Sequence, residues 1–128
     1  EQLVCSKNLN SEPILLHCSQ IKEQDNIYDI GPNSMKEITQ KILISDKIIW
    51  NGPPGVFENK NFQLGTKTLI MSIIQSKSKI KVAGGGSTIA AINYFNSNKN
   101  FTHISTGGGA FLRLLEGKFL EGIEVLKI

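Results

Sequence analysis

The chain has 128 residues, with 14 Lys or Arg and 11 Asp or Glu, and a formal net charge of +3. This length suits a single domain with its own hydrophobic core, and a composition that is 40% hydrophobic is ordinary for a globular protein. No apolar run approaches the roughly 20 residues of a membrane span, and the mild, scattered positive charge does not indicate nucleic-acid binding.

The first ten residues, EQLVCSKNLN, lack the basic patch, apolar core and cleavage site of a secretory signal. A cytoplasmic location is therefore expected, with Cys5 and Cys18 as reduced thiols. The first residue is Glu1 rather than Met, which is consistent with a chain that begins inside a longer protein.

The first half of the chain predicts two strands and a helix. Residues 13–18 form a short apolar run that fits a buried strand, and residues 27–30 fit a second, shorter one. Ser34 and Glu37 have the spacing of a capping box, in which the two side chains bond to the first backbone N–H groups of a helix. A helix over residues 35–45 is expected to follow.

The second half alternates strands with helices. Strands are predicted at 47–50, 80–83 and 102–105, and helices at 61–76, 88–95 and 110–115. Between the first of these strands and the helix after it, residues 51–55 contain two prolines and two glycines and must turn. The alternation predicts an α/β fold: a parallel sheet with helices on both faces, in a Rossmann-like three-layer arrangement.

Two glycine clusters, at residues 84–86 and 107–109, each lie between the end of a predicted strand and the start of a predicted helix. Backbone N–H groups at such a corner are unpaired, and glycine lets a phosphate approach them closely. The alternative is that the glycines only permit tight turns. The loop at 51–55 occupies the same topological position, so the three corners together favour a phosphate site. The sequence contains neither GxGxxG nor GxxxxGK[ST], which disfavours a dinucleotide oxidoreductase and a P-loop.

Glu58 follows the proline-glycine loop, where a carboxylate could accept hydrogen bonds from the two hydroxyls of a ribose. It could equally be a solvated loop acid. From the chemistry of the residue alone, the solvated acid is favoured.

Several stretches resemble phosphoglycerate kinase in order and spacing. WNGPPGVFE at 50–58 resembles the family signature WNGPxGVFE, and GGGST at 84–88 resembles its GGGDT segment. STGGGA at 105–110, followed by LEGK at 115–118, resembles a third segment, and DIGP at 29–32 matches another landmark. The similarity is dense from about residue 27 to residue 126 and fainter before it.

The resemblance implies a two-domain kinase that transfers a phosphoryl group between 1,3-bisphosphoglycerate and ADP, with Mg²⁺, in glycolysis. Residues 1–128 would be the carboxyl-terminal part of its nucleotide-binding domain, which is an incomplete domain. The other domain, which holds phosphoglycerate, and the earlier half of the nucleotide domain are not in this chain. The isolated chain is therefore expected to be inactive; the family is usually monomeric.

The resemblance also implies roles for individual residues. It places the nucleotide against Asn51, Gly52, Pro53 and Pro54, and the ribose hydroxyls on Glu58, which reverses the preference stated above. It places phosphate at Gly85, Gly86 and Thr88. Gly86, Gly107 and Gly108 would donate backbone N–H groups toward the transferring phosphoryl.

Ser87 departs from the family pattern, which has Asp at this position. A serine hydroxyl can ligate Mg²⁺ but brings no charge, so weaker binding of the magnesium-nucleotide complex is expected. Ser87 is also expected to cap the following helix. A non-catalytic nucleotide-binding or interaction module derived from the family is the alternative function.

Overall fold

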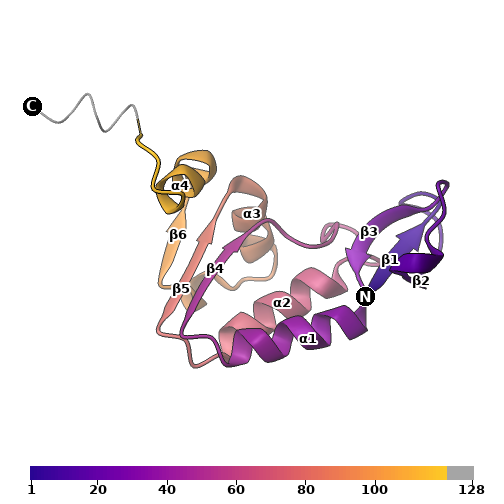
Figure 1. Ribbon diagram of the computed structural model, residues 1–128, viewed down its shortest axis with the longest axis horizontal. Helices are drawn as coiled ribbons and strands as arrows, with labels where there is room; N and C mark the ends of the chain where they lie inside the picture. Colours follow the sequence, from indigo (N-terminus) through magenta and orange to yellow (C-terminus); the bar gives the residue numbers. More distant parts are fainter. Residues whose placement is uncertain (121–128) are drawn as a thin grey trace, which may run out of the picture.

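A computed structural model describes residues 1–120. The last eight residues of the predicted 1–128 domain, and the end of the similarity to residue 126, lie outside the described residues. Two three-stranded sheets stand at opposite ends, with a pair of helices along one side between them (Figure 1). None of the helices within residues 1–120 has the length and apolar character that crossing a bilayer requires.

The amino-terminal sheet is antiparallel, with the strand order β2-β1-β3. Its strands are β1 (Gln2–Ser6), β2 (Ile14–His17) and β3 (Asn26–Ile30). The sequence analysis missed β1, and it was wrong to expect a buried strand at β2, where Ile14 is 46% exposed and Leu15 52%. The reason is that β2 is an edge strand, paired with β1 alone within the described part of the chain.

These strands also differ from the expected strand-helix alternation, because β1 pairs with both neighbours in antiparallel register. A parallel pair needs a crossover of a dozen or more residues, and the connection between β1 and β2 is too short for one.

The helix α1 (Pro32–Leu43) begins earlier than predicted, and the predicted capping box is wrong. Gly31 is the N-cap and Pro32 takes the first helical position, where its fixed φ and missing N–H cost nothing. The Ser34 hydroxyl instead accepts a hydrogen bond from the Gln2 N–H at 2.7 Å and donates one to the Gln2 carbonyl at 3.0 Å. Ser34 therefore joins α1 to β1.

The second sheet confirms the parallel α/β prediction. β4 (Lys47–Asn51), β5 (Ile80–Gly84) and β6 (His103–Ser105) are parallel and neighbours in that order. The crossovers are α2 (Leu64–Gln75) and α3 (Gly86–Tyr94). Right-handed crossovers between strands added in one direction place both helices on the same face.

That face carries the core. Trp50 of β4 and Ala83 of β5 are neighbours in register and pack in one buried cluster with Ile70 and Ile73 of α2 and Ile92 of α3. The helix α1 lies alongside α2, on the same side of the sheet.

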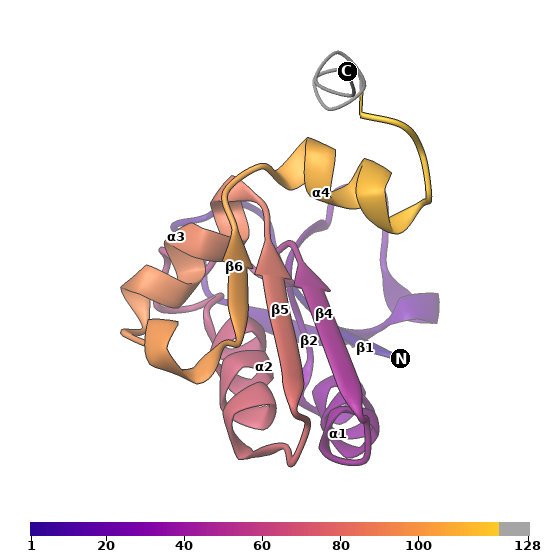
Figure 2. The ribbon, with the colours of Figure 1, turned by 90° about the vertical axis from the view of Figure 1, so that its left-hand side faces the viewer.

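Helices lie on both faces of the parallel sheet, but unequally. On the second face, α4 (Gly108–Leu115) covers only the carboxyl end, where the Phe111 ring packs against Gly84. The rest of this face is open toward the viewer in Figure 2, and Ile49 is 53% exposed on it.

Candidate functional site

Three strand-to-helix corners meet at the carboxyl edge of the parallel sheet. The last residues of β4 and β5, Asn51 and Gly84, are partners in register, and Gly84 pairs in turn with Ser105 of β6. The segments that follow these strands therefore start side by side. This edge is where open α/β sheets bind ligands.

One hydrogen bond and one close approach connect the first corner with the second, and a further hydrogen bond lies within the first corner. The Gly52 N–H donates a hydrogen bond to the Thr88 hydroxyl at 2.7 Å, and the Trp50 indole N–H donates one to the Gly52 carbonyl, also at 2.7 Å. A Cβ atom added to Gly85 would lie 3.4 Å from the amide oxygen of Asn51, so the second corner approaches the first closely. Thr88 is fully buried, so its hydroxyl holds the Gly52 loop from the interior side of the site.

The second corner is the start of α3. Gly85 is its N-cap and has φ +95°, ψ 144°, a backbone region open essentially to glycine alone. The helix begins at Gly86, two residues before the prediction, so the expected capping role of Ser87 is wrong: Ser87 already lies inside the first turn. The first N–H groups of α3, from Gly86 to Thr88, have no partner within the helix.

The third corner is the start of α4, with Gly107 as N-cap and Gly108 as the first helical residue. A side chain on Gly108 would come within 2.8 Å of the Gly85 Cα. The amino ends of α3 and α4 are therefore in backbone contact, and both direct the positive ends of their dipoles to this place. Such an arrangement stabilises an anion without a charged side chain.

Glu58 lies in a different part of the surface from these contacts. It is exposed and lines an open groove of about 590 Å³, together with Leu9, Val56 and Asn59. The groove borders the β1–β2 connection, to which the Asn59 amide donates a hydrogen bond at the Leu9 carbonyl, 2.8 Å away. Pro53 and Pro54 lie between Glu58 and the corner at Gly52.

The sequence analysis overlooked Asp29, which it treated only as part of a turn landmark. Its side chain is 1% exposed, and its carboxylate accepts hydrogen bonds from the N–H groups of Ile30 and Gly65, both at 2.8 Å. Burial raises the pKa of Asp29, while the two N–H donors act in the opposite direction. Asp29 is a single acidic residue among the apolar residues of the predicted strand at 27–30, and this pattern could have indicated a buried, functionally placed carboxylate.

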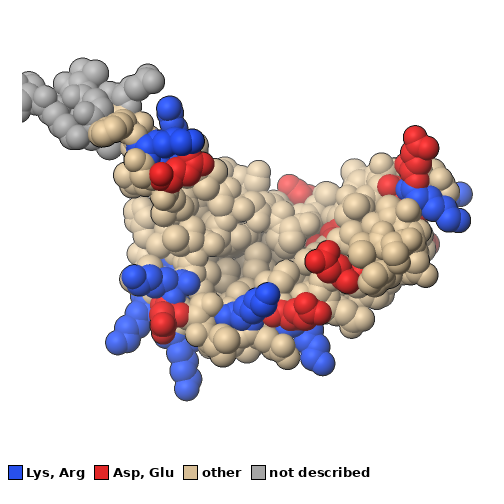
Figure 3. Space-filling model, in the orientation of Figure 1, with Lys and Arg blue, Asp and Glu red and all other residues tan. Residues whose placement is uncertain are grey.

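Charge around the site comes mainly from the backbone. In Figure 3 the floor of the hollow between the two ends of the molecule is uncharged, acidic side chains border it on the right, and side chains of both charges lie below it. Within residues 1–120 no cluster of three or more His, Cys, Asp or Glu side chains could hold a metal ion. At the corners Ser87 and Thr106 offer neutral, exposed hydroxyls. The N–H groups of the three described corners suit a phosphate, and the side chains of these corners include no carboxylate or imidazole that could bind a metal ion.

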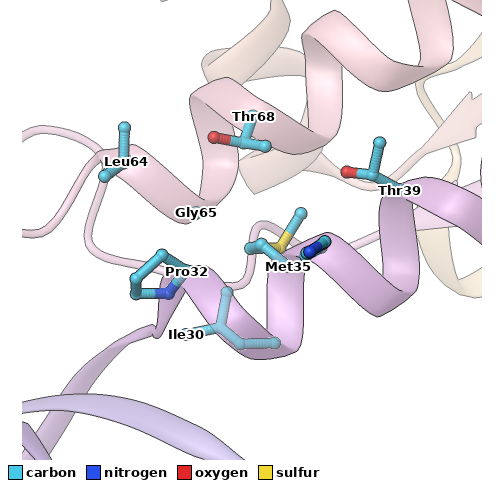
Figure 4. Close-up of a pocket in the computed structure, with 8 residues that line it drawn as sticks. Ile30, Pro32, Met35, Thr39, Leu64, Gly65 and Thr68 are labelled. Atoms are coloured by element: carbon cyan, nitrogen blue, oxygen red, sulfur yellow. The ribbon is translucent and has the colours of Figure 1, made fainter.

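An apolar pocket of about 230 Å³ lies elsewhere, between the first turns of α1 and α2 (Figure 4). Pro32 and Met35 line it from α1, and Leu64, Gly65 and Thr68 from α2. It contains none of the predicted site residues.

Comparisons with known proteins agree with the sequence motifs. The sequence model of the family described as phosphoglycerate kinase matches residues 1–118. A phosphoglycerate kinase of Vibrio campbellii is 43% identical over 127 residues, which is 98% of this chain and 33% of that protein. One from Francisella tularensis subsp. novicida is 49% identical over 118 residues, 92% of this chain and 30% of the relative.

Solved structures give the same result. The phosphoglycerate kinase from Coxiella burnetii superposes with a TM-score of 0.86 at 32% identity, over 92% of this chain and 31% of that one. The phosphoglycerate kinase from Pyrococcus horikoshii OT3 superposes with a TM-score of 0.82 at 30% identity, over 98% of this chain and 31% of that one. The chain thus spans about a third of the length of the curated relatives it matches.

Proposed function

Because the chain belongs to the phosphoglycerate kinase family, we propose that it supplies part of the nucleotide site of an enzyme that transfers a phosphoryl group between 1,3-bisphosphoglycerate and ADP. The observation that carries the proposal is the meeting of three glycine-containing corners at one sheet edge, connected by the Gly52–Thr88 hydrogen bond. We assign residues 1–128 to the carboxyl-terminal part of the nucleotide domain. The remainder of the protein would supply the phosphoglycerate site, and we expect a cytoplasmic, monomeric glycolytic enzyme.

In this reaction the phosphoryl group leaves the carboxyl oxygen of 1,3-bisphosphoglycerate and is accepted by a β-phosphate oxygen of ADP, which gives 3-phosphoglycerate and ATP. The protein needs no nucleophile of its own, because positioning and stabilisation of the equatorial oxygens carry most of the catalysis. Backbone N–H groups of Gly86, Gly107 and Gly108 would stabilise the charge on these oxygens. Gly85 and Thr88 would bound the phosphate site, with Thr88 acting through the Gly52 loop.

The nucleoside end of the substrate would extend from the glycine corners along Asn51, Gly52, Pro53 and Pro54. Glu58, exposed in its groove, would accept hydrogen bonds from the ribose hydroxyls. Mg²⁺, when bound with the nucleotide, would neutralise phosphate charge. At the start of α3, the Ser87 hydroxyl is the side chain that could contact this Mg²⁺.

Glu58→Ala in the full-length protein that carries this chain tests the nucleotide assignment. We expect the KM for ATP to rise about tenfold, because a pair of hydrogen bonds to a charged group is lost. The KM for 3-phosphoglycerate should change less than twofold. Glu37→Ala, which removes an exposed acid of α1, is the matched control. An unchanged KM for ATP in Glu58→Ala would contradict the assignment.

Ser87 is the observation that favours the alternative, a module that binds nucleotide without catalysis. We expect Ser87→Asp to tighten binding of Mg-ADP, measured by calorimetry, and to raise kcat, because Mg²⁺ prefers anionic oxygens. Ser87→Asn, which adds similar bulk without charge, is the control. Mg-ADP binding by a wild-type full-length protein that shows no phosphoryl transfer would favour the non-catalytic module.

A further inference from the structure

Asp29 is the one acidic or basic side chain within residues 1–120 that is buried. A buried carboxylate is costly unless hydrogen bonds satisfy it, and here both oxygens are used. Oδ1 accepts from the Ile30 N–H and Oδ2 from the Gly65 N–H. Gly65 is in the first turn of α2, where a negative charge also interacts favourably with the helix dipole.

The carboxylate is enclosed by two glycines that delimit one segment of chain. A side chain on Gly55 or on Gly65 would overlap the Asp29 carboxylate. Gly55 ends the proline-glycine loop and Gly65 lies in the first turn of α2, so Asp29 contacts both ends of residues 55–65. Glu58 lies within this segment.

Other contacts hold the same segment against β3. The Val56 N–H donates a hydrogen bond to the Tyr28 carbonyl at 2.9 Å, and the Phe62 ring packs on the Tyr28 ring with centroids 4.9 Å apart. The Thr66 hydroxyl accepts a hydrogen bond from the Gly55 N–H at 3.3 Å. The position of Glu58 therefore depends on the end of β3, and Asp29 is the polar centre of that connection.

We infer that Asp29 is a positioning residue for the nucleotide: its carboxylate fixes residues 55–65 and, through them, places the Glu58 carboxylate against the ribose. This inference rests on the proposed function. It assigns Asp29 no contact with substrate.

The test is a double-mutant cycle in the full-length protein that carries this chain. Asn can offer only one acceptor oxygen, so Asp29→Asn leaves one of the two N–H groups facing another donor. We expect the KM for ATP to rise about tenfold in Asp29→Asn, with the KM for 3-phosphoglycerate within twofold. In a Glu58→Ala background the same substitution should raise the KM for ATP less than about twofold, because the residue that it positions is absent.

Asp25→Asn is the matched control. It removes the same charge from just before β3, at a side chain that bonds only to the Lys22 N–H among the described contacts. Its KM for ATP should equal that of the wild type.

The outcomes separate the two proposals. If the wild type is active but Asp29→Asn leaves the KM for ATP unchanged, the inference about Asp29 is overturned and the proposed function stands. The same conclusion follows if Asp29→Asn has equal effects on the KM for ATP in the presence and absence of Glu58. A wild type that neither binds Mg-ADP nor transfers phosphoryl would overturn the proposed function and this inference with it.

If Asp29→Asn does not fold, Thr66→Val is used instead, with Thr66→Ser as its control. Thr66 is fully buried and contacts the same segment at Gly55. A higher KM for ATP in the Val variant alone would support the inference, and an unchanged KM in both would overturn it.

Discussion

The Thr88 hydroxyl shows how one buried atom can join two corners of a site. It accepts the Gly52 N–H at 2.7 Å, and Gly52 in turn accepts the indole N–H of Trp50 through its carbonyl. The carboxyl end of β4 and the first turn of α3 are therefore held in one arrangement. Sequence reasoning identified Thr88 as a phosphate residue, and this role stays a prediction.

Thr88→Val keeps the shape of the side chain and removes the acceptor. We expect a loss of about 1–3 kcal/mol in the free energy of unfolding, because the Gly52 N–H is left without its partner. Urea unfolding of the 128-residue chain measures it, with Thr88→Ser as the control that retains the hydroxyl. The fluorescence of Trp50, the one tryptophan in the sequence, reports the same loop. Equal stabilities of the Val and Ser variants would contradict the prediction.

Asp29 gives a pH dependence with a definite sign. Burial raises the pKa of Asp29 in the folded chain above the usual 3.8. Between pH 3.8 and the folded-state pKa, the folded chain therefore binds a proton that the unfolded chain has released. The contribution to stability is therefore full below pH 3.8 and is lost as the pH rises through the folded pKa.

We expect the free energy of unfolding of the wild type, relative to Asp29→Asn, to decrease as the pH is raised from this value. The difference between the two proteins cancels the titration of the other acids. Urea unfolding of both at several pH values measures it. A difference that increases with pH would contradict the raised pKa.

At the scale of elements, α1 shows why a capping pattern is an incomplete guide. Ser34 and Glu37 have capping-box spacing, yet the helix starts at Pro32, three residues before the predicted start, and Ser34 bonds to the backbone of β1. The partner of Ser34 is 32 residues away in sequence, so no local pattern could have identified it.

Ser34→Ala should consequently affect β1 more than α1. We expect faster hydrogen exchange at the Gln2 amide, which loses its acceptor, with helix content by circular dichroism unchanged. Glu37→Ala should leave both unchanged, because Glu37 makes no cap. A loss of helix content in either variant would contradict this expectation and support a capping box at Ser34 and Glu37.

Most other elements follow from local pattern. The parallel strands and the helices between them were predicted within a few residues, because apolar periodicity and the glycine and proline breaks are local signals. The strand β1 was missed because its run is short and includes polar ends. Its partners β2 and β3 make it a strand.

At the scale of the whole molecule, the parallel sheet is covered unevenly. The helices α2 and α3 bury one face, whereas Ile49 on the other is 53% exposed beside the partly exposed Val82. An apolar sheet face of this kind promotes association unless other residues cover it.

We therefore expect the 128-residue chain to self-associate in a concentration-dependent way. Ile49→Lys should lower the weight-average mass in sedimentation equilibrium, because it places a charge on the open face. Ile44→Lys is the control: Ile44 is 83% exposed but follows α1, away from the sheet. A wild-type chain that is monomeric at all concentrations, or equal effects of the two substitutions, would contradict this.

The sequence by itself determined the α/β class, the three glycine-containing corners and membership of the phosphoglycerate kinase family, because each depends on residues close together in the chain. Only the tertiary structure decided which corners touch, that Gly85 and Gly108 meet through their backbones, and that Asp29 contacts both ends of the segment with Glu58. It also decided that β1–β3 form a separate antiparallel sheet. Such contacts join residues tens of positions apart, and packing and hydrogen-bond satisfaction select them only when the whole chain is in place.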